Sequence, residues 1–269
     1  MRRASLAVLR CPACRGAFDL EPSAGAEVDA GELKCVACRR TWPIRNSIPR
    51  LMFPEELAKE DARVERFWNR IAPAYDLLSR VTAVQRGVPE DAERRQLARR
   101  LGVQAGSTVL EVAVGTGSNL KAIAEGTGNS VTTYGLDISW RILERARRKL
   151  GRLSPASELV VGNAHYLPFA DDVFDVVLGG YGTKYFTDKA QALREMLRVT
   201  RPGGRIVVAD LGLPPGKRLT LRQRLLRLWI PGISEGPPMD AVPAEALDVK
   251  LDWDAHETAY VIEFRKTAG

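Results

Sequence analysis

The stretch Val109–Asn119, which reads VLEVAVGTGSN, decides the fold. An apolar run leads into Gly115-Thr116-Gly117, and a polar segment that can begin a helix follows. Glycine adopts left-handed backbone without strain and lets the main chain approach a ligand closely. A buried strand, a glycine turn and a helix amino terminus together form a common site for nucleotide-like ligands. The sequence therefore predicts a strand over 108–114, a helix over 118–125 and a binding loop between them.

Two acidic residues beside this loop restrict the ligand. Asp137 ends the next predicted strand, about 20 positions after the loop, where a carboxylate suits the two hydroxyls of a ribose. Glu111 precedes the loop, where it would welcome a cationic amino group and repel a phosphate. The loop also lacks the third glycine at the place where a pyrophosphate would lie. These features favour a nucleoside with a cationic tail over a nicotinamide dinucleotide.

Strand and helix patterns alternate on both sides of the loop. The predicted strands are 108–114, 131–136, 158–161, 173–179 and 205–211, and the predicted helices are 118–125, 139–150 and 189–199. A helical pattern over 61–79, broken by Pro73, and another over 89–101 come before them. Two strands over 246–253 and 258–265 are close enough to form a hairpin. The sequence thus predicts an α/β fold, a doubly wound and mostly parallel sheet with a C-terminal antiparallel hairpin.

Composition sets the broad class. The 269 residues are 45% hydrophobic and 27% charged, a globular balance with room for one large domain and one small one. No apolar run reaches the roughly 18 residues of a membrane span, and the apolar stretch that ends at Arg10 is too short for a signal peptide. We therefore expect a cytoplasmic protein. The net charge of +7 makes nucleic acid or an anionic membrane surface worth considering as partners.

The four cysteines lie near the amino terminus, in two CxxC pairs: Cys11, Cys14, Cys35 and Cys38. Two such turns can direct four sulfurs at one point, the tetrahedral set that structural Zn²⁺ accepts. Two disulfides or redox-active thiols are the alternatives, but a reducing compartment disfavours disulfides and a redox pair needs no twin. A lobe this small cannot stabilise itself by apolar burial, so the metal would supply folding energy on the order of 10 kcal/mol.

Longer motifs carry a family resemblance. VLEVAVGTG, YGLDIS, GNAHYLPFADDVFDVV and LREMLRVTRPGGRIVVAD resemble class I S-adenosylmethionine-dependent methyltransferases, and within them the ubiquinone/menaquinone C-methyltransferases, over residues 64–211. FWNRIAPAYD, residues 67–76, resembles that family's entrance helix, whose tyrosine closes over the cofactor. Residues 6–53 resemble the small zinc-ribbon protein that activates tRNA, rRNA and protein methyltransferases. The implied domains are a zinc ribbon over 1–53, a linker over 54–63 and a methyltransferase domain over 64–269.

The resemblance implies S-adenosylmethionine as cofactor and assigns site residues. The cofactor-binding candidates are Gly115, Thr116 and Gly117 for the methionine part, Glu111 for the ammonium end, Asp137 for the ribose hydroxyls, Ile138 for packing on adenine, and Asn163 and Ala164 for the adenine edge. The family usually has aspartate where Asn163 stands, although an amide oxygen can still accept a hydrogen bond from the adenine amino group.

Three polar residues are candidates for the catalytic part of the site. Tyr75 would be the lid over the cofactor, His165 a general base and Lys184 a polar group near the acceptor. Residues 182–185 read GTKY where the quinone methyltransferases carry a Gly-Leu-Arg-Asn type sequence, so the sequence leaves the acceptor open.

The sequence predicts a methyltransferase for a small acceptor that is lipophilic or a secondary metabolite. An rRNA or tRNA methyltransferase that uses the ribbon for recognition is the alternative, and a silent fold that serves as a protein-docking module is a third reading. The chain shows no interleaved aromatic and basic stretch of the kind that stacks bases, so nucleic acid is the less favoured partner.

One predicted helix lies outside these motifs. Residues 217–230 carry five basic side chains and no acid, and Leu221, Leu225, Leu228 and Trp229 share one side of a helical projection. This pattern suits a crossover helix whose apolar side packs on the sheet. It also suits an apolar lid over the acceptor pocket that makes peripheral contact with an anionic membrane.

Overall fold

One continuous sheet organises the computed structural model, which describes residues 1–21, 25–151, 157–230, 232–233 and 236–268. The strand order within these residues is β1-β2-β3-β4-β7-β6-β5-β8-β9-β11-β10. The strands are β1 Phe18–Glu21, β2 Gly31–Cys35, β3 Thr41–Arg45, β4 Ile48–Leu51, β5 Thr108–Val112, β6 Thr132–Asp137, β7 Ser157–Gly162, β8 Phe174–Gly180, β9 Thr200–Leu211, β10 Leu247–Trp253 and β11 Ala259–Arg265.

Helices surround the large part of this sheet. They are α1 Lys59–Ile71, α2 Tyr75–Arg86, α3 Glu90–Arg100, α4 Ser118–Thr127, α5 Trp140–Leu150, α6 Lys189–Val199 and α7 Leu221–Trp229. Short 3₁₀ turns lie at η1 Arg3–Ala7, η2 Ala72–Ala74, η3 Thr183–Tyr185 and η5 Met239–Ala241. Adjacent strands from β4 to β9 run parallel, whereas β9, β11 and β10 pair antiparallel. The predicted α/β class, the parallel sheet and the terminal hairpin are confirmed.

The two faces of the sheet have different covers, because side chains alternate along each strand. One apolar cluster joins Val109, Val176 and Val207 to residues of α3, α4 and α5. The other joins Leu110 and Val177 to residues of α6 and to the amino-terminal segment over residues 1–53, here called the ribbon. The ribbon therefore covers part of a face that would otherwise be exposed.

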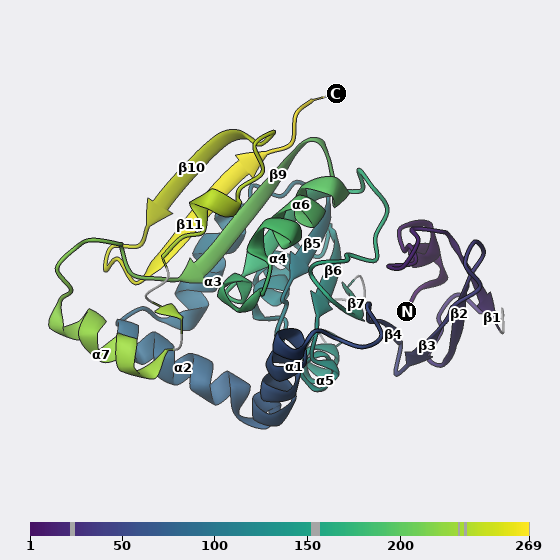
Figure 1. Cartoon of the computed structure of the whole chain (residues 1–269), viewed down its shortest axis with the longest axis horizontal. Coiled ribbons are helices and arrows are strands. Elements are labelled where there is room, and N and C mark those ends of the chain that lie inside the picture. The colour runs from purple at the N-terminus through teal and green to yellow at the C-terminus, as the bar shows by residue number, and fades with distance from the viewer. Residues whose placement is uncertain (22–24, 152–156, 231, 234–235, 269) are drawn as a thin grey trace.

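The ribbon also extends the sheet itself. Strand β4 pairs parallel with β7 through Arg50 and Leu51, and Figure 1 shows this junction between the purple ribbon and the central strands. Ile48–Leu51 is a strand here because the edge of β7 offers unpaired hydrogen-bonding groups. Arg2 contributes a further contact, an ion pair with Glu158 of β7 at 2.7 Å.

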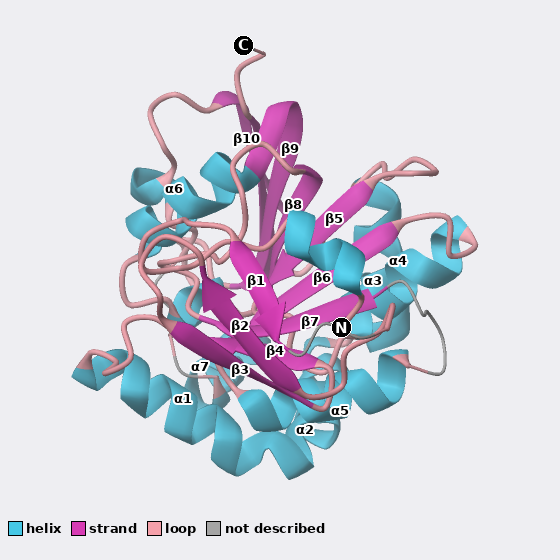
Figure 2. Cartoon of the chain, turned by 90° about the vertical axis from the view of Figure 1, so that its right-hand side faces the viewer, coloured by secondary structure: helices cyan, strands magenta, loops and turns pink. Residues whose placement is uncertain are grey.

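A break at Pro73 shapes the region next to the site. The break predicted at Pro73 within the helical pattern over 61–79 is confirmed: α1 and α2 are separated by η2, because proline cannot continue the hydrogen-bond ladder. α2 ends at Gly87, whose left-handed φ of 70° stops the helix. In Figures 1 and 2, α1, α2 and α7 lie along the lower edge of the molecule. The turn of the C-terminal hairpin reaches α2 and α7, since Arg86 bonds to Thr258 and Gln223 bonds to the backbone oxygen of His256. Within the described ranges, no helix combines the length and apolar character that crossing a bilayer requires.

Candidate active site and cysteine cluster

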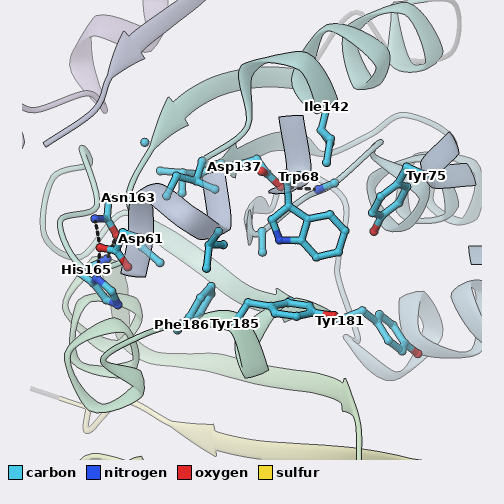
Figure 3. Close-up of a pocket in the computed structure, with 18 residues that line it drawn as sticks. Asp61, Trp68, Tyr75, Asp137, Ile142, Asn163, His165, Tyr181, Tyr185 and Phe186 are labelled. Atoms are coloured by element: carbon cyan, nitrogen blue, oxygen red, sulfur yellow. Dashed lines mark hydrogen bonds and ion pairs between the residues drawn. The ribbon is translucent and has the colours of Figure 1, made fainter. Parts of the chain in front are cut away.

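A cavity with about 630 Å³ of empty space, here called the first cavity, lies at the carboxyl ends of β5, β6 and β7. Figure 3 shows its lining, to which α1, α2 and the loop after β8 also contribute. Of the predicted cofactor residues, Gly115, Asp137, Ile138, Asn163 and Ala164 all line it. Residues that are up to 49 positions apart in the chain thus converge on one site, because parallel strands end at the same edge of a sheet.

Asp137 lies in the middle of this lining. Its two carboxylate oxygens accept hydrogen bonds from the backbone N–H groups of Gly115 and Ser139, both at 2.9 Å. Burial raises the pKa of Asp137 to about 6, although these N–H groups oppose the shift. The bonds hold the side chain still and leave lone pairs for two hydroxyl donors, as the predicted ribose role requires.

Glu111 lies behind the glycine loop, in a smaller hollow that it shares with Thr116 and Tyr75. Its Oε1 accepts from the Asn119 side chain at 2.5 Å, while its Oε2 is buried without a hydrogen-bond partner among the described residues. Burial raises the pKa of Glu111 to about 8. A buried carboxylate oxygen without a partner is costly, and a cationic amino group would supply what is missing.

Tyr75 begins α2 and forms a wall of the first cavity. A Cβ placed on Gly115 would lie 2.9 Å from the Tyr75 hydroxyl, so this glycine is what permits the close contact. The neighbouring Asp76 accepts a hydrogen bond from the Thr116 hydroxyl at 2.6 Å and one from Lys149 at 3.1 Å. Thr116 thus contacts α2 directly, and its hydroxyl ties the start of that helix to the glycine loop.

Asp61 is a site residue that the sequence reasoning missed. Asp61 extends from α1 into the first cavity, where its buried side chain lies next to Asn163. Its oxygens accept hydrogen bonds from the Thr187 hydroxyl at 2.6 Å and from the Asn163 amide at 3.2 Å. The missing family carboxylate at position 163 is therefore matched by a carboxylate from another element. The signal was in the sequence: Asp61, Val64 and Trp68 have helical spacing, and all three line the cavity.

The contacts of His165 differ from those of a general base. Its Nε2 accepts the backbone N–H of Asp188 at 3.2 Å, and its Nδ1 lies 3.5 Å from Asp61 Oδ2. An imidazole whose Nε2 accepts a hydrogen bond carries its proton on Nδ1. Neither nitrogen is therefore free to take a proton from an acceptor. The geometry instead makes His165 a support for Asp61 and for the start of α6.

A second cavity with about 920 Å³ of empty space, bounded by α1, α2, α3 and the loop after β8, adjoins the first. Trp68, Tyr75, Tyr181 and Tyr185 line both cavities. The Trp68 ring packs edge-on against the rings of Tyr75 and Tyr185, with centroids 5.7 and 5.0 Å apart. A shared aromatic wall thus separates the two spaces.

Lys184 lies in the wall of the second cavity only. Its ammonium pairs with the fully buried Asp210 at 3.0 Å, and Asp210 also accepts from the Thr183 hydroxyl at 2.8 Å. Arg94, which the sequence did not single out, lines the same cavity, with its guanidinium 4.1 Å from the centre of the Tyr181 ring. The second cavity therefore has charged groups on one side, whereas α2 and Ile230 contribute apolar side chains to it.

The four cysteines converge as the spacing predicts. The sulfurs of Cys11, Cys14, Cys35 and Cys38 all lie within 4.8 Å of one another, and none forms a disulfide. Four thiolates around one Zn²⁺, each about 2.3 Å from the metal, would be separated by about 3.8 Å. A Cβ on Gly16 would lie 2.9 Å from the Cys35 sulfur, so glycine at this position leaves space for the cluster. The donor set and its dimensions fit a structural tetrahedral metal site.

Comparison with known proteins identifies both parts of the chain. Residues 56–221 match the model of the ubiE/COQ5 methyltransferase family, and residues 2–47 match that of Trm112p-like proteins. The chain is 32% identical over 161 residues to the ubiquinone/menaquinone biosynthesis C-methyltransferase of Geotalea daltonii, covering 59% of this chain and 67% of that protein. It is 36% identical over 157 residues to the demethylmenaquinone methyltransferase of Halalkalibacterium halodurans, covering 58% and 62%.

Solved structures agree on the fold. The [4+2]-cyclase SpnF matches with a TM-score of 0.62 and 17% identity over 80% of this chain and 98% of its own. A chain from the complex between the Trm112 methyltransferase activator of Haloferax volcanii and a methyltransferase matches with a TM-score of 0.56 and 19% identity, over 74% and 98%. The family model covers more than half of the chain, so the protein belongs to the ubiE/COQ5 methyltransferase family and is an S-adenosylmethionine-dependent methyltransferase with a Trm112p-like ribbon at its amino terminus.

Proposed function

We propose that the protein methylates a small lipophilic acceptor that lies in the second cavity while S-adenosylmethionine occupies the first. The observation that carries this proposal is the wall common to both cavities, formed by Trp68, Tyr75, Tyr181 and Tyr185. A methyl group can pass between two ligands only where their sites meet. The faces of aromatic rings also attract a sulfonium cation.

The residues of the first cavity, together with Glu111 in the hollow behind the glycine loop, fit the cofactor from end to end. Glu111 offers its unpartnered oxygen to the ammonium group, Asp137 offers its carboxylate to the ribose, and Asp61 with Asn163 offers oxygen acceptors to the adenine amino group. When bound, the cofactor supplies an activated methyl group for an in-line displacement. The protein's own contribution is then to orient the two ligands and to exclude water, as Tyr75 and Trp68 do from the aromatic wall.

The acceptor follows from the character of the second cavity. Its apolar part, with Leu78, Leu211 and Ile230, suits a hydrophobic body, and Lys184 and Arg94 suit a polar oxygen on that body. The relatives named demethylmenaquinone methyltransferases support a quinone-like acceptor, whereas the GTKY sequence at 182–185 supports a different head group. We propose that the acceptor comes from a membrane, with which the protein makes peripheral contact.

A transfer assay tests the function. The protein is incubated with methyl-labelled S-adenosylmethionine and with lipid, aqueous and RNA fractions of the source cells, and products are followed by mass spectrometry. We expect the label in a lipid-soluble product that gains the mass of one methyl group, and none with Asp137→Ala protein. Label only in RNA would instead establish the rRNA or tRNA reading, which the curated relatives do not favour.

We propose that the cysteine cluster holds one structural Zn²⁺ in a reducing, cytoplasmic compartment. The support is the closeness of the four sulfurs, their lack of disulfides and the match to Trm112p-like proteins. Metal analysis should find one zinc per chain in the native protein and less than half of that after Cys35→Ser. Retention of full, tightly bound zinc by the variant would refute the ligand set.

A further inference from the structure

α2 directs its apolar side chains away from the protein. Val84 is 79% exposed and Leu77 is 66% exposed, and Val81 is also exposed. At 100° per residue these three lie on one stripe, opposite the buried Ala83 and Arg86. A surface helix of a globular protein normally shows the reverse arrangement.

α7 repeats this inverted pattern. Leu221, Leu225 and Leu228 are exposed by 74%, 53% and 80%, and they form one stripe. The buried side of the helix consists of Gln223, Leu226 and Ile230 instead. The sequence led us to expect the leucine stripe either to pack on the sheet or to form an apolar lid in contact with a membrane, and the exposure of these leucines contradicts packing on the sheet. The side chain of Trp229 lies outside the described part. Gln223 replaces the leucines on the inner side because it bonds to the backbone oxygens of His256 and Glu257, each at 3.2 Å.

The two stripes belong to one surface at the mouth of the second cavity. α2 and α7 are neighbours, since the Arg222 side chain donates a hydrogen bond to the backbone oxygen of Arg86 at 3.1 Å. Leu78 of α2 and Ile230 at the end of α7 both line the second cavity, as does the exposed Phe67 of α1. Figure 1 shows the three helices side by side in a row.

The charge of this surface is positive. Exposed arginines flank the leucine stripe of α7 at positions 222, 224 and 227, and α7 carries no acidic residue. Arg80 of α2 is exposed as well, and the single acid of α2, Asp76, is occupied by Lys149. An apolar strip between cations matches the interface of an anionic bilayer, where acyl chains lie beneath phosphate groups.

We propose that the solvent faces of α2 and α7 form a membrane-docking surface for a bilayer with anionic headgroups. The leucines and valines enter the boundary between headgroups and acyl chains, and the arginines bind lipid phosphates. Docking in this orientation turns the opening of the second cavity toward the lipid. This last step rests on the proposed function, whereas bilayer binding itself stands on the surface alone.

Vesicle flotation tests the surface without any assay of methyl transfer. The full-length, zinc-loaded protein is mixed with vesicles of phosphatidylcholine alone or with 30% phosphatidylglycerol added. We expect binding to the anionic vesicles at low salt, at least tenfold stronger than to the neutral ones, and release as ionic strength rises. Absence of binding to the anionic vesicles would overturn the proposal, even if the enzyme methylates a lipophilic acceptor added in detergent.

Two sets of variants separate the contributions. Leu221→Gln, Leu225→Gln and Leu228→Gln together should reduce partitioning at least tenfold, and Arg224→Gln with Arg227→Gln should reduce it about tenfold at low salt only. Leu247→Gln with Val249→Gln on β10, and Arg194→Gln with Arg265→Gln on α6 and β11, make matched changes far from the surface and should bind as the native protein does. Calorimetric affinity for S-adenosylmethionine should stay unchanged throughout, which verifies folding.

The same variants identify another occupant of the surface. If native protein ignores vesicles but forms a dimer in sedimentation, and the leucine substitutions abolish that dimer, a second copy of the chain covers the surface. That result would overturn membrane docking. Equal loss of vesicle binding in the β10 control would also overturn membrane docking, because binding would then not depend on the surface formed by α2 and α7.

Discussion

The two cavities differ in how the chain builds them. The first is formed largely by the ends of consecutive strands and by contiguous motifs, such as the glycine loop at 115–117 and the segment 162–165. The second takes its walls from α1, α2, α3, η3 and the end of α7, elements that belong to no single motif. A ligand that every family member shares can be recognised by a short constant segment, whereas an acceptor is recognised by packing between helices.

The difference extends to electrostatics. Asp137 in the first cavity and Glu111 in the hollow behind the glycine loop are buried, and burial raises the pKa of both. The charges of the second cavity are already paired, as Lys184 is with Asp210 and Arg86 is with Glu93 at 2.7 Å. The unpartnered Glu111 oxygen thus leaves the proposed cofactor site incomplete without a ligand, whereas the second cavity has ion pairs in its wall and offers mainly shape and apolar contact.

The strongest test of this contrast is Asp137→Ala. Two hydrogen bonds to a charged acceptor contribute about 1.5–3 kcal/mol each, so affinity for S-adenosylmethionine should fall at least a hundredfold. Calorimetry measures the change, and Asp171→Ala, which removes an exposed acid paired with Arg198, should bind normally. Native affinity in the Asp137 variant would end the ribose assignment.

Glu111→Gln should show that burial of the Glu111 carboxylate lowers the free energy of unfolding of the protein. Because the pKa of Glu111 rises from 4.5 to about 8 on folding, the folded state holds an extra proton between these values. The free energy of unfolding should therefore decrease as pH rises through that range and level off above it. The variant lacks this dependence and should be more stable than the native protein at pH 8, by on the order of a few kcal/mol. Thermal unfolding from pH 5 to 8.5 measures the slope.

The same substitution should weaken cofactor binding about tenfold. Native affinity should peak near pH 8, since Glu111 must lose a proton below that pH and the α-amino group of the ligand loses its own above it. The substitution should flatten the rising side of the profile. A native protein whose affinity is constant from pH 6 to 8 would contradict a role for Glu111 at the ammonium group.

Asp61→Asn should lower affinity for S-adenosylmethionine by about three- to fivefold, because one acceptor at the adenine edge loses its charge. The effect should vanish with an analogue that carries hypoxanthine in place of adenine, because hypoxanthine has no amino group to donate. Thr187→Val, which removes the hydroxyl that supports Asp61, serves as a milder comparison. Equal losses for both ligands would place Asp61 away from the base.

The smallest change in ligand binding is expected for substitutions in the second cavity. Lys184→Met with Asp210→Asn removes a buried pair without leaving a lone charge, so the protein should fold. The KM for the acceptor should rise about threefold while the affinity for S-adenosylmethionine stays constant. A loss of cofactor binding in this double variant would erase the distinction between the cavities.

The sequence predicted the fold, and most of the residues predicted for the cofactor line one cavity, because strand–loop–helix signals are local. The glycine loop, Asp137 and the cysteine pairs can each be recognised from a few neighbouring residues. In the structure Gly115 and Asp137 line one cavity, and the four cysteines form a separate cluster. Tyr75 was predicted from the resemblance of residues 67–76 to the family's entrance helix, and it lies where α2 begins, directly after the proline break.

What the sequence did not reveal depends on contacts across the chain. Asp61 reaches Asn163 from 102 positions away. The spacing of Asp61, Val64 and Trp68 indicates one face of a helix, but it does not show that this face meets Asn163. The sequence could not decide whether the leucine stripe of α7 faces the sheet or the outside, because periodicity shows that a helix has an apolar side but not which way that side faces. His165 looked like a base until the backbone of Asp188 was seen to occupy its Nε2.

The parallel pairing of β4 with β7 protects the open edge of the sheet. An exposed parallel edge is a template on which another chain can assemble, and here the first segment of the same polypeptide covers it. If the proposed Zn²⁺ holds the ribbon together, loss of the metal exposes this edge and the apolar face beneath the ribbon at the same time. Zinc depletion would then favour aggregation of the enzyme.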